Sequence, residues 1–68
     1  MSRTFIFETS HLALWAEDVA RERGIHAQLG PAPSAAEDKC GLALRTGDAD
    51  ATALEAALRA EGIEFRTL

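Results

Sequence analysis

The fold of this 68-residue chain follows from Arg21-Glu22-Arg23-Gly24-Ile25, a segment that recurs in altered form as Arg59-Ala60-Glu61-Gly62-Ile63. Each copy follows a segment in which apolar residues recur every three or four positions, the spacing of an amphipathic helix. Glycine suits the left-handed position that ends a helix, and the isoleucine after it can pack back on the last turn. The repeat therefore predicts two helices, each ending at a glycine and leading into a strand.

The segments on either side of the two copies complete the predicted order of elements. Short runs with bulky, alternating side chains are typical of strands, and Thr9 or Ser10 can cap the first helix. A polar connection stiffened by prolines is expected over 31–39. The expected helices span 10–23 and 48–61, and the expected strands span 3–8, 26–30, 41–46 and 64–68.

The order β-α-β-β-α-β predicts an α+β fold of the ferredoxin-like, split βαβ type. Such a fold has a four-stranded antiparallel sheet with both helices on one face, and the length allows one domain, residues 1–68. The expected core is Phe5, Phe7, Leu12, Trp15, Val19, Leu29, Leu42, Leu44, Leu54, Leu58, Ile63 and Phe65. The opposite sheet face should be mostly polar and covered by solvent or a partner, with Thr4, Ile6, His26, Gln28, Arg45, Glu64 and Arg66.

Composition limits the classes of function. The formal net charge of −4 argues against nucleic acid and anionic membranes as partners, because both attract basic surfaces. A single cysteine cannot form an internal disulfide, and no secretory signal or membrane-spanning run is visible. We therefore expect a cytoplasmic protein with a free thiol.

Topology predicts where the only cysteine, Cys40, lies. In a split βαβ fold the third strand runs antiparallel beside the first, so the third strand starts at the edge where the first one ends. Residues 9–11, which open the first helix, belong to the same edge. We therefore expect Cys40 within one loop's reach of them. Its sulfur, in register with Leu42 and Leu44, should point to the helix side.

Such a position favours a thiolate. The free N–H groups at a helix N-terminus carry partial positive charge, and Lys39 and His11 add cationic or hydrogen-bonding groups. Neighbours of this kind lower a thiol pKa from about 8.5 to about 3.5–7.5. Gly41 leaves the backbone beside the sulfur open, whereas the carboxylates of Glu8 and Asp38 would raise the thiol pKa.

The alternative is that Cys40 only packs, because free cysteine is among the most often buried residue types. The two interpretations differ in the setting of the sulfur, which is either exposed at a helix N-terminus or enclosed under Leu42 and Trp15. His26 is expected to lie on the polar face without a role in binding or chemistry. No metal-ligand spacing is present, so we expect no metal and no cofactor beyond a transient sulfur or selenium adduct on Cys40.

Five ordered stretches are spread along residues 9–65: Thr9-Ser-His-x-Ala-Leu-x-Ala-Glu17, Gly24-Ile25, Pro31-x-Pro33, Cys40-Gly-Leu-Ala-Leu-Arg45 and Gly62-Ile-Glu-Phe65. Together they resemble the putative Se/S carrier protein-like family, a family of small bacterial domains. The resemblance implies that the cysteine of the Cys-Gly motif, Cys40 here, handles sulfur or selenium. It also implies a desulfurase-type donor and a sulfur or selenium acceptor protein as partners.

These observations predict a carrier rather than a turnover enzyme. Cys40 would hold the atom as a persulfide or selenosulfide, with Thr9, Ser10, His11, Lys39 and Gly41 as supporting residues. The rival hypothesis is a non-catalytic module that binds a ligand or a protein, with Cys40 as a packing residue. The outer strands of the predicted sheet are short, so we expect a monomer or a weak homodimer.

Overall fold

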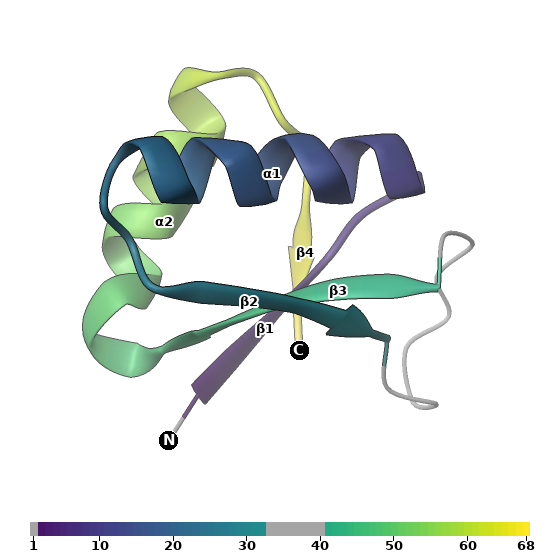
Figure 1. Cartoon of the computed structure of the whole chain (residues 1–68), viewed down its shortest axis with the longest axis horizontal. Coiled ribbons are helices and arrows are strands. Elements are labelled where there is room, and N and C mark those ends of the chain that lie inside the picture. The colour runs from purple at the N-terminus through teal and green to yellow at the C-terminus, as the bar shows by residue number, and fades with distance from the viewer. Residues whose placement is uncertain (1, 33–40) are drawn as a thin grey trace.

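A computed structural model describes residues 2–32 and 41–68 of the chain (Figure 1). Four strands form one antiparallel sheet in the order β2-β3-β1-β4, and both helices lie on one face of it. The predicted ferredoxin-like α+β fold is therefore confirmed, including β2 and β4 as the outer strands. The elements are β1 (Ser2–Ile6), α1 (Ser10–Glu22), β2 (Ala27–Pro31), β3 (Leu42–Gly47), α2 (Asp48–Ala60) and β4 (Arg66–Thr67).

Both helices end in the way that the repeated pentapeptide predicts. Gly24 and Gly62 have φ angles of 70° and 78°, in the left-handed region that glycine adopts without a Cβ clash. The N–H of Ile25 donates to the carbonyl of Ala20 at 2.9 Å, and the N–H of Ile63 donates to that of Leu58 at 2.9 Å. With the accompanying bonds from the two glycine N–H groups, each end is a Schellman motif.

The core lies between the sheet and the helices. α1 packs over β2 and β3, and α2 packs over β3 and β1. Small side chains at Ala13, Ala16 and Ala20 let α1 approach the sheet closely, and all three are buried. The largest fully buried side chains are Phe5, Phe7, Ile6, Leu44, Leu54 and Leu58.

Two side chains depart from the predicted burial. Trp15 is wrong as a core residue, because 39% of it is exposed; it lies one residue, or about 100° around the helix axis, from the inward Ala16. Ile6 does lie on the helix-free face, where its register partner is Ala43. The expectation that solvent covers it is wrong, because only 1% of Ile6 is exposed.

The strand ends also differ from those predicted. β1 ends at Ile6 rather than at residue 8, and β4 contains only two paired residues instead of five. β2 includes Pro31, which pairs with Leu42. A proline is tolerated there because β2 is an outer strand, where no second neighbour needs the missing N–H.

Candidate functional site

The pairing of β1 with β3 brings the start of β3 to the edge of the sheet where β1 ends. Ile6, the last residue of β1, pairs with Ala43 near the beginning of β3. Three residues link Ile6 to α1, so the start of α1 lies at this same edge (Figure 1). Gly41 and the first turn of α1 therefore belong to one edge, as the topology predicted. Cys40 and Lys39 lie outside the described residues.

Gly41 is exposed and has a φ angle of 72°. Its carbonyl accepts a hydrogen bond from the N–H of Ala32 at 3.0 Å, one step beyond the last paired residues of β2 and β3. This bond fixes Gly41 to the end of the β2–β3 pair. The residue after the cysteine thus has a defined backbone position, with a left-handed conformation that favours glycine.

Thr9 caps α1 and so fixes the direction in which the helix starts. Its Oγ1 accepts a hydrogen bond from the N–H of Leu12 at 3.1 Å, and its carbonyl accepts one from the N–H of Ala13 at 3.2 Å. Of the two residues that the sequence allowed as the cap, Thr9 is the one used. Ser10 is the first residue of the helix and is exposed.

The Thr9→Ala variant should lower the free energy of unfolding by about 1 kcal/mol, the usual value of an N-cap hydroxyl. Urea unfolding followed by circular dichroism measures the change. Ser10→Ala is the matched control, because it removes the neighbouring exposed hydroxyl without removing the cap. Equal losses in the two variants would contradict the assignment of Thr9 as the cap.

The two helix N-termini carry different charges. α1 has no acidic residue in its first turn, whereas α2 has Asp48 and Asp50 in its first turn. Carboxylates at a helix start neutralise the partial positive charge of the exposed N–H groups. The N-terminus of α1 therefore keeps more of its positive potential than that of α2.

His11 is exposed and lines a surface hollow with Leu14, Trp15 and Asp18. Leu14 and Trp15 are half and about two-fifths exposed, at 50% and 39%. None of the hydrogen bonds between described residues joins His11 to Gly41. The predicted approach of His11 to the sulfur stays a prediction, because Cys40 lies outside the described residues. The residues that share its hollow are Leu14, Trp15 and Asp18, and the sequence analysis had assigned neither Leu14 nor Trp15 to a surface.

The described residues also bear on metals and membranes. No group of three metal-ligating side chains occurs within 2–32 and 41–68. In the same segments, neither helix combines the length and the apolar character that a bilayer span requires.

The model of the putative Se/S carrier protein-like family matches residues 3–68. The chain belongs to this family. The match includes Cys40, and it includes Gly41 and the first turn of α1, two features that the described structure places at one edge of the sheet. The resemblance carried by the five sequence stretches is therefore confirmed, and the family's name suggests a carrier of selenium or sulfur. No curated protein and no solved structure matches the chain.

Proposed function

We propose that this member of the family carries a sulfur or selenium atom on Cys40. The observation that carries the proposal is the family match over residues 3–68, which includes the Cys-Gly pair. Cys40 is the only cysteine in the chain, so a single thiol is available for such an atom.

The charges of the described residues near this edge support the proposal. Gly41 shares the edge with the first turn of α1, which itself contains no acidic residue. Glu8, the residue before the cap, is the carboxylate that acts against a thiolate there. A thiolate, the nucleophilic form of cysteine, is stabilised by such a terminus and by nearby cations. We assign Ser10 and His11 to the stabilising helix start, Thr9 to its cap, and Lys39 as the cation beside the sulfur in sequence.

Loading is a thiol–disulfide-type exchange without net oxidation. The Cys40 thiolate attacks the outer sulfur of a persulfide on a donor enzyme, and the donor's S–S bond breaks. The donor leaves as a thiolate, and a new S–S bond holds the atom on Cys40. An acceptor thiolate can then attack the outer sulfur in the same way, which returns Cys40 to its thiolate form.

A carrier must dock against its donor, and α1 has an apolar surface for this purpose. Leu14 and Trp15 are exposed beside His11, on the helix that starts at the Gly41 edge. Tryptophan is enriched among the residues that dominate protein–protein binding energy. Contact at this hollow would bring a donor to the side of the molecule where the proposed chemistry occurs.

The proposal is tested by incubating the full chain with a cysteine desulfurase and cysteine, and then measuring its intact mass. One added sulfur atom is expected, and a reducing thiol should remove it. The rate of Cys40 alkylation against pH should give an apparent pKa below the value of about 8.5 for free cysteine. A folded chain that gains no sulfur from several desulfurases and alkylates with an unperturbed pKa would refute the carrier function and favour a binding module.

A further inference from the structure

Arg45 has no ion-pair partner among the described residues, in contrast to the arginines that carboxylates neutralise. It is exposed on β3, and none of the ion pairs between described residues includes it. An unneutralised guanidinium is notable in a chain with 11 acidic residues and a net charge of −4. Carboxylates lie within 3.0–3.5 Å of Arg3, Arg21, Arg23 and Arg59.

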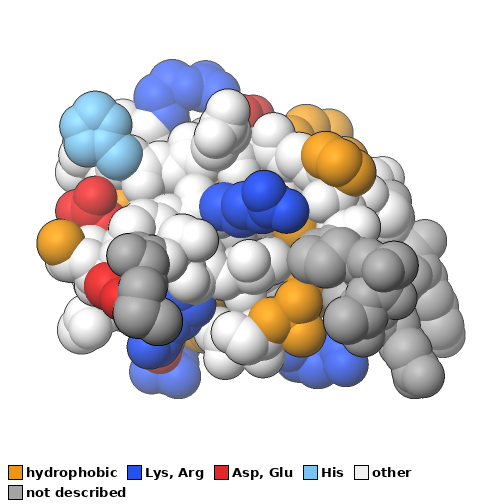
Figure 2. Space-filling view, turned by 90° about the horizontal axis from the view of Figure 1, so that it is seen from below, with side chains coloured by type: hydrophobic (Ala, Val, Ile, Leu, Met, Phe, Trp, Pro, Cys, Tyr) orange, Lys and Arg blue, Asp and Glu red, His pale blue; other side chains and the backbone are white. Residues whose placement is uncertain are grey.

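Arg45 lies on the sheet face that no helix covers. Its register partners are Gln28 on β2 and Thr4 on β1, so their side chains share this face. Figure 2 views the molecule from this side and shows a basic side chain near the middle of the surface. Arg45 is itself exposed, so the face is open to solvent at its position.

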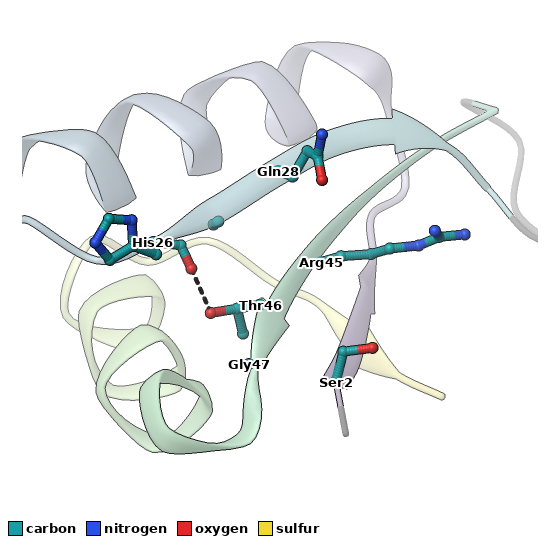
Figure 3. Close-up of a pocket in the computed structure, with 7 residues that line it drawn as sticks. Ser2, His26, Gln28, Arg45, Thr46 and Gly47 are labelled. Atoms are coloured by element: carbon teal, nitrogen blue, oxygen red, sulfur yellow. Dashed lines mark hydrogen bonds between the residues drawn. The ribbon is translucent and has the colours of Figure 1, made fainter.

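A hollow of about 520 Å³ surrounds this part of the face. Ser2, Gln28 and Arg45 line it from three neighbouring strands, and His26 borders it just before β2 (Figure 3). No acidic residue is among the described residues that line it. Its lining consists of Ser2, His26, Ala27, Gln28, Arg45, Thr46 and Gly47.

The base of the hollow is held in place by the sheet. Thr46 Oγ1 donates a hydrogen bond to the carbonyl of His26 at 2.6 Å, which joins the end of β3 to the residue before β2 (Figure 3). The Thr46 hydroxyl proton is thereby used, and only 4% of Thr46 is exposed. The groups left for a ligand are the Arg45 guanidinium, the Gln28 amide, the Ser2 hydroxyl and the His26 ring.

We propose that this hollow, the Arg45 pocket, binds a small organic anion through a carboxylate or another oxyanion group. The planar guanidinium donates paired hydrogen bonds to two oxygens of one such group. Gln28 and Ser2 add neutral donors, and no carboxylate in the lining repels the anion. The volume lies within the range of about 300–1,000 Å³ typical of small-molecule sites, so a ligand larger than a bare ion fits.

The Arg45 pocket is separate from the proposed sulfur site. It lies at the end of β3 that contains Thr46 and Gly47, whereas Gly41 precedes the other end. Thr46 follows Gly41 by five residue steps along the strand, a distance of about 17 Å at roughly 3.3 Å per residue. Binding of an anion here therefore does not depend on the sulfur chemistry.

The test is a titration of the full chain followed by amide and arginine side-chain NMR signals. Inorganic phosphate and succinate are the probes, which distinguish a tetrahedral oxyanion from a carboxylate, and sodium chloride at equal ionic strength is the reference. Saturable shifts are expected for residues 26–28 and 45–47 and for the Arg45 side chain. Shifts that grow without saturation, or that chloride reproduces, would overturn the proposal.

Three variants distinguish binding through the paired hydrogen bonds of Arg45 from a general attraction of the anion to positive charge. Arg45→Gln should weaken binding by about tenfold or more, the scale of losing a charge-assisted hydrogen bond. Arg45→Lys keeps the charge but loses the planar fork, and it should also weaken binding. Arg21→Gln, at an exposed arginine of α1, should leave binding unchanged. Equal weakening by Arg45→Gln and Arg21→Gln would show a non-specific charge effect and would overturn the proposal.

Discussion

Replacing Cys40 with serine is expected to abolish sulfur loading completely. Serine has nearly the same size, but its hydroxyl is not ionised near neutral pH and does not form the S–S bond that holds the transferred atom. Intact mass after incubation with a desulfurase and cysteine should show one added sulfur atom on the native chain and none on Cys40→Ser. The effect is all-or-none because the chain has no second cysteine.

The control for this variant is its stability. Thermal unfolding of Cys40→Ser should follow a cooperative transition like that of the native chain, so that lost loading reports lost chemistry. Leu14→Ala and Trp15→Ala add a second comparison, because both change the exposed surface of α1 and leave the thiol in place. They should slow loading by the donor without slowing alkylation by a small reagent. Sulfur retained on Cys40→Ser would show that another group accepts it and would refute the role of Cys40.

Leu54→Ala is expected to remove most or all of the stability of the fold. Leu54 is completely buried in the core cluster formed by the helices and the sheet. Truncating a buried leucine costs about 2–5 kcal/mol, and a core in a domain this small supplies about 3–5 kcal/mol in all. Urea unfolding and circular dichroism at 25 °C should therefore find a large unfolded population.

Leu14→Ala is the matched control, because it makes the same chemical change at a side chain that is 50% exposed. Substitutions at such surface positions usually change stability by less than about 0.5 kcal/mol. Comparable losses in Leu54→Ala and Leu14→Ala would contradict the assignment of the core. The pair thus isolates burial from the intrinsic helix propensity of leucine and alanine, which is the same at both sites.

The fold was predictable because local signals and the overall pattern agree. The repeated Arg-x-x-Gly-Ile sequence marks both helix ends, and the Schellman hydrogen bonds at Ile25 and Ile63 supply its physical reason. Alternation in the strands assigned Phe5 and Leu44 to the same face, and they pair directly. Agreement between the local and overall patterns is what allows a short sequence to specify one topology.

The departures arise where burial depends on neighbours that are distant in sequence. Helical spacing places Trp15 at the border of the inward stripe, where 39% of it is exposed. Alternation places Ile6 correctly on the helix-free face, but it does not tell how far neighbouring side chains cover it. β4 is shorter than its composition suggests, because only two of its residues pair with β1.

The candidate sites were predictable to different extents. Topology alone predicted that Gly41 and the start of α1 share one edge of the sheet. The sequence identified Arg45 only as one of several polar residues on the helix-free face. What distinguishes Arg45 is that no ion pair between described residues includes it. That property depends on which carboxylates the fold brings to Arg3, Arg21, Arg23 and Arg59, and a linear pattern does not contain this information.

The backbone at Gly41 has a consequence for variation at the Cys-Gly pair. Among the described residues, nothing lies within 4 Å of the position that a Cβ would occupy there, so they restrict the residue by handedness and not by size. An L-amino acid at a φ angle of 72° is strained however small its side chain is. The backbone conformation therefore restricts position 41 to glycine, whereas position 40 is restricted by the chemistry that its side chain performs. Related chains that have lost the thiol are expected to retain the glycine. The glycine alone therefore indicates the left-handed backbone position before β3, and it does not indicate a carrier.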